Sequence, residues 1–202
     1  MKKKIKYNSY GGMGFIESLI AIMVVGVASV VLMRIAASTM SDAVENERID
    51  KMTQYAVEGA NMAENIVQEF YEYPTSSDAI SFFDKIALSF PTNIKCFVPE
   101  TIGNPQVYQF KKDVSLQFIA IQISSLTIES INNHKDDFPR AEIMTNNVGS
   151  GFFRYACFYP YTASTDKQIN VGIVVGHLAS EGTYTARRNV KHYIYSTVIP
   201  LR

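Results

Sequence analysis

The most restrictive feature of this sequence is an uncharged apolar run that continues into an unbroken helical pattern. Residues 18–33 (SLIAIMVVGVASVVLM) contain no charged side chain, and Glu17 lies directly before them. Between Arg34 and Tyr73 there is no proline, and Gly59 is the only glycine. We therefore predict one helix over 14–73, about 60 residues or roughly 90 Å long at 1.5 Å per residue. Its first half is apolar on every side, which indicates a membrane-bound segment.

The second half of this helix is amphipathic. Apolar residues recur at alternating steps of three and four, which places a narrow apolar stripe on one side of the helix. The stripe comprises Ile49, Met52, Ala56, Gly59, Ala63, Ile66 and Phe70. Pro74 ends the pattern, as a proline just beyond a helix should. We expect most of the stripe to pack against the chain's own C-terminal part.

Basic residues cluster before the apolar run. The first twelve residues contain no acid and four lysines, Lys2, Lys3, Lys4 and Lys6. Without them the chain has 15 basic residues against 19 acidic ones, a net charge of −4. This mildly acidic remainder disfavours a general nucleic-acid surface. Lysines before an apolar segment stay in the cytoplasm, so the chain after Arg34 is expected outside it. A cleaved secretory signal is the alternative, although residues 36–38 offer only a weak small-residue site.

After Pro74 the pattern changes to one short helix followed by strands, which is typical of an α+β chain. The turn 75–78 can cap a helix that ends before Pro91. We expect its buried side to comprise Ile80, Phe83, Ile86, Ala87 and Phe90. Alternating apolar residues predict strands over 114–118, 119–123, 152–159, 169–175 and 190–199. The alternation changes parity after Phe118, which indicates a bulge or a strand buried on both faces. The expected exposed loops are 132–140 and 161–167.

Cys96 and Cys157 are the only cysteines in the chain. An exported chain with two cysteines is expected to join them, since oxidising compartments favour disulfides. In the chain-entropy model, closing a loop of about 60 residues stabilises the fold by roughly 4 kcal/mol. The alternative is a pair of buried, unbonded thiols.

The N-terminal arrangement resembles type IV pilins and the pseudopilins of type II secretion systems. Their signature is a short basic leader that ends in Gly, with Glu as the fifth residue after the cut. A cut between Gly12 and Met13 makes Glu17 the fifth residue, whereas a cut after Gly14 makes it the third. The resemblance implies a leader (1–12), a transmembrane and assembly helix (13–40), its amphipathic continuation (41–73) and an α+β head (74–202). The implied fold is a long N-terminal helix packed on a C-terminal antiparallel β-sheet.

The resemblance also implies roles for three residues. Gly12 would be the cleavage residue for a prepilin peptidase, Met13 the N-methylated residue, and Glu17 the assembly residue that pairs with a neighbour's N-terminal amine. A cation and a carboxylate brought together in hydrocarbon offset two otherwise costly charges. The alternative for Glu17 is a lipid-facing carboxylate without a partner. The family's common proline in the apolar half is missing, and Met13 replaces the usual Phe.

From this resemblance we expect a filament subunit, and the start at Met13 favours a minor pilin. Its expected partners are other pilin subunits, the prepilin peptidase and an inner-membrane assembly platform. It would cross the inner membrane once with its head outside, then enter an extracellular or periplasmic filament. A secretion pseudopilin is the close alternative. An anchored adhesin or sensor that never polymerises is an alternative of a different class.

No catalytic pattern is present in the sequence, and we expect neither an enzyme nor a cofactor. His134, His177 and His192 lack ligand-spaced neighbours, so a metal site is not expected. Asp136 and Asp137 are expected to be a solvated pair, with calcium binding as the alternative, and residues 149–151 (GSG) to be a turn rather than a phosphate cradle. One basic cluster comprises Arg187, Arg188 and Lys191. Cations among tyrosines can hold single-stranded DNA. The favoured interpretation of this cluster is a solvated hairpin turn.

Overall fold

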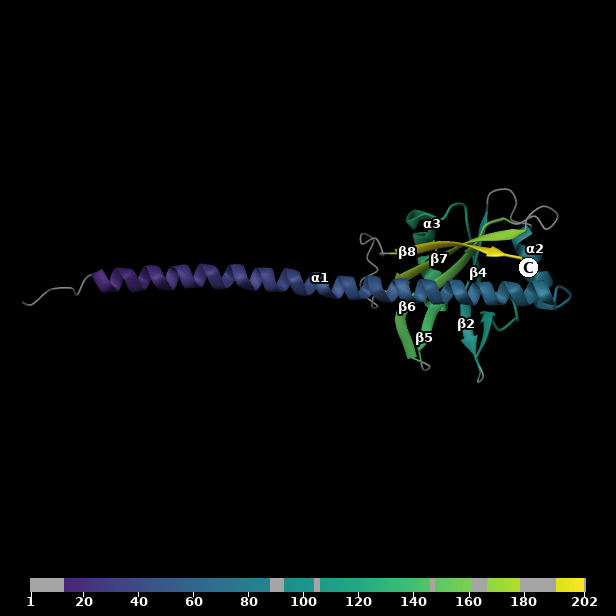
Figure 1. The fold of residues 1–202 in the computed structure, drawn as a ribbon, viewed down its shortest axis with the longest axis horizontal. Helices are drawn as coiled ribbons and strands as arrows, with labels where there is room; N and C mark the ends of the chain where they lie inside the picture. Colours follow the sequence, from purple (N-terminus) through teal and green to yellow (C-terminus); the bar gives the residue numbers. More distant parts are fainter. Residues whose placement is uncertain are drawn as a thin grey trace, which may run out of the picture. The chain divides into compact units, whose positions relative to one another are not determined.

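The computed structural model describes residues 13–87, 93–103, 106–145, 148–160, 167–178 and 192–201 (Figure 1). The chain divides into two compact units, residues 1–47 and 48–202. Helix α1, Met13–Glu72, supplies the whole described part of the first unit and the first element of the second. The sequence prediction of one long helix is confirmed to within one residue at each end.

The second unit contains the second half of α1 and a sheet. Among the described residues, the sheet has six strands in the order β4-β1-β6-β7-β8, with β5 paired to β6. These strands are β1 Ile94–Phe97, β4 Ala120–Ile123, β5 Glu142–Thr145, β6 Val148–Phe158, β7 Gln168–His177 and β8 His192–Pro200. Every pairing is antiparallel. Strands β2, Pro99–Ile102, and β3, Val107–Phe110, form a separate antiparallel hairpin.

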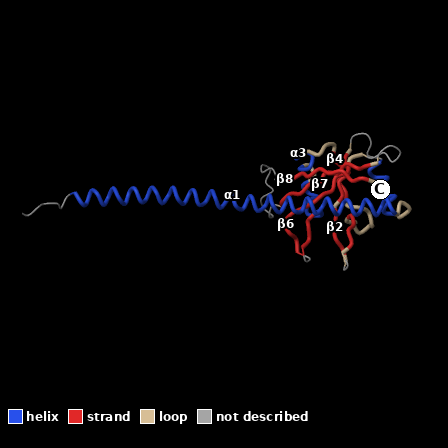
Figure 2. Tube along the Cα trace, in the orientation of Figure 1, coloured by secondary structure: helices blue, strands red, loops and turns tan. Residues whose placement is uncertain are grey.

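The two faces of this sheet bury different layers. Along β6, Phe152, Ala156 and Phe158 belong to the core shared with α1 and α2, whereas Phe153 and Tyr155 belong to a second core. This alternation follows from the two-residue period of a strand. The second core is completed by α3, Ile128–Asn132, and a 3₁₀ helix, η1, Lys135–Ala141. Figure 2 shows the strands (red) beside the second half of α1 (blue). The fold is therefore α+β, with a long N-terminal helix packed on an antiparallel sheet.

The α1 stripe packs largely as predicted. Met52, Ala56, Ala63, Ile66 and Phe70 are buried in the core shared with the sheet. Ile49, which begins the predicted stripe, is 41% exposed instead. The amphipathic half of α1 thus covers one sheet face.

Helix α2, Ser77–Ala87, begins where the sequence predicted it. Ser76 caps it, because its Oγ accepts a hydrogen bond from the N–H of Ala79 at 3.2 Å. The predicted buried side is confirmed at Ile86 and is otherwise wrong by one residue in register. Ala79, Phe82 and Ile86 are buried, whereas Ile80 and Ala87 are exposed and Phe83 is half-buried. Phe90 lies outside the described residues.

Residues 114–118 do not form the predicted strand. Residues 113–117 make a turn, in which Val114 and Leu116 are exposed and Leu116 has a φ of 60°. The prediction failed because alternating apolar and polar residues also occur in a tight turn. Segment 132–140 is largely helical in η1 rather than an irregular loop. Most of the predicted loop 161–167 lies outside the described residues.

Candidate functional site

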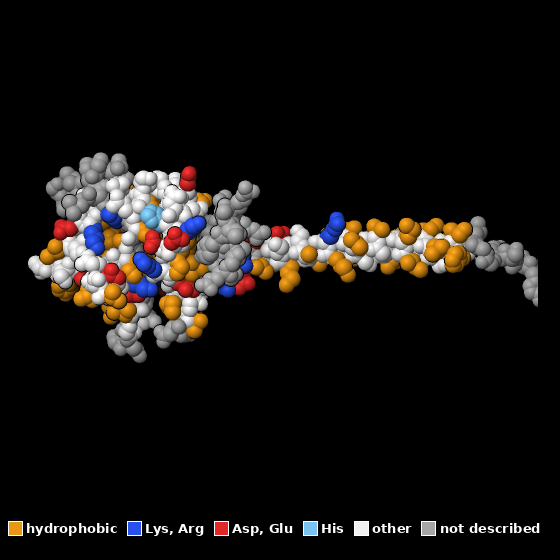
Figure 3. Space-filling model, turned by 180° about the vertical axis from the view of Figure 1, so that it is seen from behind, with side chains coloured by type: hydrophobic (Ala, Val, Ile, Leu, Met, Phe, Trp, Pro, Cys, Tyr) orange, Lys and Arg blue, Asp and Glu red, His pale blue; other side chains and the backbone are white. Residues whose placement is uncertain are grey.

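The apolar half of α1 is the candidate functional site, because its large side chains have no protein cover. In the first unit, large apolar side chains are exposed on every side of the helix, up to 73% for Met23. Figure 3 shows those on one face in orange. Within the described residues, α1 is the one helix long and apolar enough to cross a membrane. Length and composition thus make it a candidate membrane span.

The polar groups of this segment are satisfied inside the helix. Ser18 Oγ donates a hydrogen bond to the carbonyl of Phe15 at 2.9 Å, and Ser29 Oγ donates to that of Val25 at 2.8 Å. The backbone N–H and C=O groups pair along the helix. A bilayer offers no water for unpaired polar groups, so only such self-contained segments are tolerated there. The segment therefore fits an apolar environment, with Glu17 as the exception.

Glu17 is exposed near the start of α1. Among the described residues, no cation lies within ion-pair distance of its carboxylate. The next charged residue along the chain is Arg34, about 25 Å further on at 1.5 Å per residue. An ionised carboxylate costs about 2.5–3.5 kcal/mol at the centre of a bilayer and less near its surface. The described part of this chain therefore supplies no counter-ion for Glu17.

The predicted processing site lies at the edge of the described residues. Gly12 lies outside the described residues, and only the backbone of Met13, the first residue of α1, is described. Both roles therefore stay predictions.

Where α1 crosses the sheet, it covers the single buried charged residue of the described chain, Arg154. The Arg154 side chain on β6 is 3% exposed. Its Nη1 donates to the carbonyl of Tyr55 at 3.2 Å and lies 3.3 Å from Glu58 Oε2, and its Nη2 donates to Met62 Sδ at 3.0 Å. Burial lowers the pKa of the guanidinium, and the Glu58 carboxylate opposes that shift.

Gly59 makes room for this arginine. A Cβ at this position would lie 2.6 Å from Arg154 Cδ and 3.0 Å from Ile173 Cγ2. A methyl group at this point would therefore force the Arg154 side chain or the helix to shift. Sequence reasoning missed Arg154, since it lies in a run of strand residues and its partners are distant in sequence. The lone glycine of the amphipathic half was the signal that marked the crossing.

Cys96 and Cys157 form a disulfide, as predicted. The two residues are direct cross-strand partners in the β1–β6 pair, and both are fully buried. They lie in the second core, on the sheet face away from α1. The bridge therefore ties β1 to β6 across a loop with a sequence separation of 61 residues. It cannot serve as a surface thiol.

The three histidines lie in different surroundings. His134 Nδ1 is 3.7 Å from Asp137 Oδ2, His177 packs edge-on against the ring of Phe152, and His192 lies against Phe153. Burial lowers the pKa of His177, and Arg48 lowers it further. Within the described residues, no group of three or more His, Cys, Asp or Glu side chains could hold a metal ion.

Of the two acidic residues in η1, Asp136 and Asp137, only Asp137 makes the contacts described here. The carbonyl of Asp137 accepts a hydrogen bond from Tyr155 Oη at 3.1 Å, and its carboxylate lies 3.6 Å from Arg140 Nη1. Burial raises the pKa of Tyr155 well above its ordinary value, which keeps this donor protonated. Asp136 is exposed.

Residues 149–151 lie within β6 rather than in a turn. Gly151, with a φ of 75°, donates its N–H to Glu142 Oε1 at 3.0 Å, and the same carboxylate occupies the space beside Gly149. These glycines therefore hold a carboxylate of their own chain. The basic cluster of Arg187, Arg188 and Lys191 lies outside the described residues, so its predicted DNA contact stays a prediction.

Comparisons of this chain with protein-family models, with curated proteins and with solved structures found no match.

Proposed function

We propose that this chain is a membrane-anchored structural subunit of a type IV pilus or pilus-like filament, in the role of a minor pilin. One observation carries the proposal. Glu17 is a carboxylate without a counter-ion in the described chain, in an uncovered apolar helix, five residues after the Gly12–Met13 junction. A simple membrane anchor gains nothing from a charge at that position.

The physical argument concerns cover for the apolar half of α1. Exposed aliphatic surface of this extent needs lipid or other apolar helices around it. In the membrane the cover is lipid, and in a filament it is the same segment of neighbouring subunits. A neighbour's N-terminal amine at Met13 then provides the counter-ion for Glu17. The pairing offsets the cost of both charges and fixes the register between adjacent helices.

The second half of α1 has a different task in this proposal. It is packed on the sheet through a buried stripe and through Arg154, so a pull on the helix is transmitted to the head. The head is further braced by the Cys96–Cys157 bridge. A subunit that is extracted from a membrane and carries load requires such a connection.

The first test is the mature N-terminus. Mass spectrometry of the protein from its natural host should show a chain that begins at Met13, with the amine methylated. A chain that keeps residues 1–12 in cells with an active prepilin peptidase would refute filament assembly, and would assign the protein to anchored adhesins or sensors.

The second test is Glu17→Ala, with Asp42→Asn as a matched control that removes an exposed acid outside the apolar run. Glu17→Ala should leave export and leader processing intact and reduce incorporation into filaments, as measured by immunoblots of sheared filaments. Asp42→Asn should behave as wild type. Equal incorporation of the two variants would refute the pairing. Filaments that stop short of the cell surface would assign the subunit to a secretion pseudopilus.

A further inference from the structure

Strand β8 forms one edge of the six-stranded sheet. It is nine residues long, and among the described strands it pairs with β7 alone. No other backbone group of the described chain bonds to its outer side. An edge strand of this kind presents a row of N–H and C=O groups that can pair with a further strand.

The hydrogen bonds of the sheet show which groups of β8 point outward. Residues of an antiparallel strand alternate between those that bond to the partner strand and those that point away from it. The N–H of Leu201 donates to the carbonyl of Lys167 at 2.9 Å, so this pair is a hydrogen-bonded one. The register continues without interruption along the whole of β8. The N–H and C=O groups of Ile194, Ser196 and Val198, which have the opposite parity to Leu201, therefore point away from the sheet.

Two further contacts support this parity. The N–H of Tyr159 donates to the carbonyl of Asn170 at 3.1 Å, so the even-numbered residues of β7 face β6 and the odd-numbered ones face β8. Pro200 is at an outward position of β8, where a missing N–H costs no bond to β7. Its carbonyl accepts a hydrogen bond from Gln68 Nε2. The outward groups without a described partner thus end at Val198.

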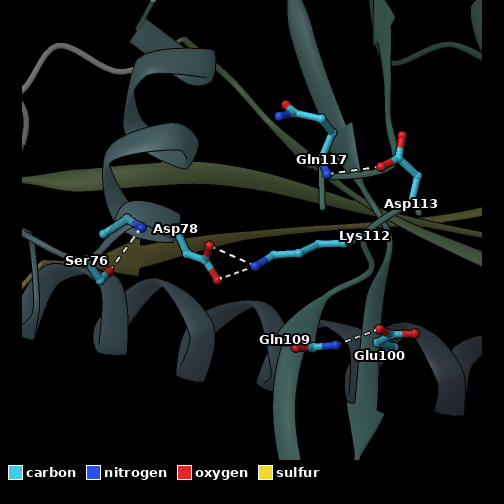
Figure 4. Close-up of polar contacts among 8 residues, drawn as sticks. Ser76, Asp78, Glu100, Gln109, Lys112, Asp113 and Gln117 are labelled. Atoms are coloured by element: carbon cyan, nitrogen blue, oxygen red, sulfur yellow. Dashed lines mark hydrogen bonds and ion pairs between the residues drawn. The ribbon is translucent and has the colours of Figure 1, made fainter. Parts of the chain in front are cut away.

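The centre of β8 lacks the features that usually protect an edge strand, which are short length and charged side chains. Residues 193–199 (YIYSTVI) carry no charge and consist mainly of β-branched and aromatic residues. Strands β2, β3, β4 and β5 are only four residues long. Polar contacts also tie the β2–β3 hairpin and the segment that follows it, since Gln109 Nε2 donates to Glu100 Oε1 at 2.8 Å and Lys112 pairs with Asp78 (Figure 4). Among the described strands, β8 alone is long, uncharged at its centre and unpaired on one side.

We propose that β8 pairs antiparallel with β8 of a second copy of this chain, with Ser196 on the two-fold axis. In this register Ser196 lies opposite Ser196 of the second copy, and Ile194 lies opposite Val198. All three residues with outward groups then find a partner, and each pair exchanges two hydrogen bonds. A shift to either side leaves some of these groups unpaired.

The side chains of β8 favour a second copy as the partner. In the proposed register Tyr195 lies opposite Thr197, and Tyr193 lies opposite Ile199. Aromatic and β-branched residues stabilise antiparallel strands as cross-strand pairs. Because residues 193–199 carry no charge, two copies meet without like-charge repulsion. The candidate membrane span in α1 would also keep copies of the chain in one membrane, which raises their effective concentration.

The contact uses the same patch on both copies. Such an isologous contact closes at two copies and does not extend into an array. It therefore goes beyond the proposed filament function and adds a dimer of heads to it. The contact needs neither leader cleavage nor Glu17, so Glu17→Ala should leave it unchanged even where filament assembly fails.

The first test is a crosslink in the full-length protein in membranes, with Ser196→Cys and the matched control Val198→Cys. Both positions are exposed, and the native cysteines are already joined to each other. In the proposed register the two copies of position 196 are hydrogen-bonded partners with Cα atoms about 5.5 Å apart, within reach of a disulfide. The two copies of position 198 lie about 13 Å apart along the strands, at 3.3 Å per residue.

Mild oxidation should therefore give a covalent dimer with Ser196→Cys and none with Val198→Cys. The absence of a dimer with Ser196→Cys would overturn the proposal. Equal yields from the two variants would overturn it as well, because they would indicate random collision in the membrane.

The second test exchanges charge at the two-fold axis. Ser196→Lys and Ser196→Glu change an exposed side chain and should keep the melting temperature of the wild type. Each variant alone places like charges opposite each other, which should raise the dissociation constant of the dimer about fivefold. A mixture of the two variants should restore the dimer, and Ser196→Thr should behave as wild type. Sedimentation of the full-length protein in detergent micelles measures this, and equal association of all variants would place the contact elsewhere and refute the pairing of β8.

Discussion

The strongest stability prediction concerns Glu58→Gln, because Arg154 beneath α1 depends on one counter-ion. The guanidinium is 3% exposed, and the Glu58 carboxylate is its one acidic partner among the described residues. Its Nε has no hydrogen-bond partner in the described chain, and Nη2 donates only to a sulfur. The variant keeps the shape of the side chain and removes the charge. Arg154 is then a buried cation without compensation.

The magnitude follows from the exposure of the two partners. Breaking a fully buried ion pair by removing one partner costs about 3–5 kcal/mol. The side chain of Glu58 is 48% exposed, so water screens the pair and reduces the loss to roughly 2 kcal/mol. For a unit of this size, that loss lowers the melting temperature by about 4–8 °C. Arg154→Met, which removes the cation and keeps a long side chain, should be close to neutral because apolar replacements of buried charges are often neutral or stabilising.

The assay is a double-mutant cycle on residues 41–202, measured by urea denaturation. Glu58→Gln should be clearly destabilising in the wild-type background and nearly neutral in the Arg154→Met background. The difference is the coupling between the two charges. Equal effects of Glu58→Gln in both backgrounds would show that the carboxylate does not compensate Arg154, and would refute the reasoning.

Three further predictions concern the same unit. Replacing Cys96 and Cys157 together by alanine should lower the free energy of unfolding by up to about 4 kcal/mol; equal urea midpoints for the variant and the oxidised wild type would contradict this. Gly59→Ala should destabilise the fold by about 1–3 kcal/mol because the new methyl group meets Arg154. Helix propensity alone predicts that alanine stabilises the helix. A lower urea midpoint would support the clash with Arg154, and a higher one would contradict it. Burial lowers the pKa of His177 in the folded state from 6.5, so the unfolded state binds a proton more readily. The contribution of neutral His177 to stability is therefore complete above pH 6.5 and lost as the pH falls through the lowered pKa. In thermal melts, His177→Gln should lose less melting temperature than wild type over this pH range.

The case of α2 shows where the sequence pattern stops being sufficient. Its apolar residues fit two helical faces that differ by one residue, one with Ala79 and Phe82 and one with Ile80 and Phe83. Periodicity cannot choose between them. The structure chooses the first, because Phe82 completes an aromatic cluster with Phe97 and other rings from the sheet. Packing across elements decides the register.

The turn at residues 113–117 shows a second limit. Val114, Leu116 and Phe118 alternate with polar residues in the way a strand does. The Asp113 carboxylate instead bonds to two backbone N–H groups and closes a turn. Local side-chain bonds of this kind compete with strand pairing, and only the pairing of the surrounding strands shows which arrangement prevails.

The sequence by itself determined the long helix, its apolar first half and the positions of Gly12, Met13 and Glu17, because these features depend on neighbours a few residues apart. It also indicated the disulfide, because two cysteines allow only one pairing. The tertiary structure alone decided that Arg154 passes beneath α1, since its partners Tyr55 and Met62 lie 99 and 92 positions away. A buried charge is stable only in a complete set of distant contacts, and no local pattern records such a set.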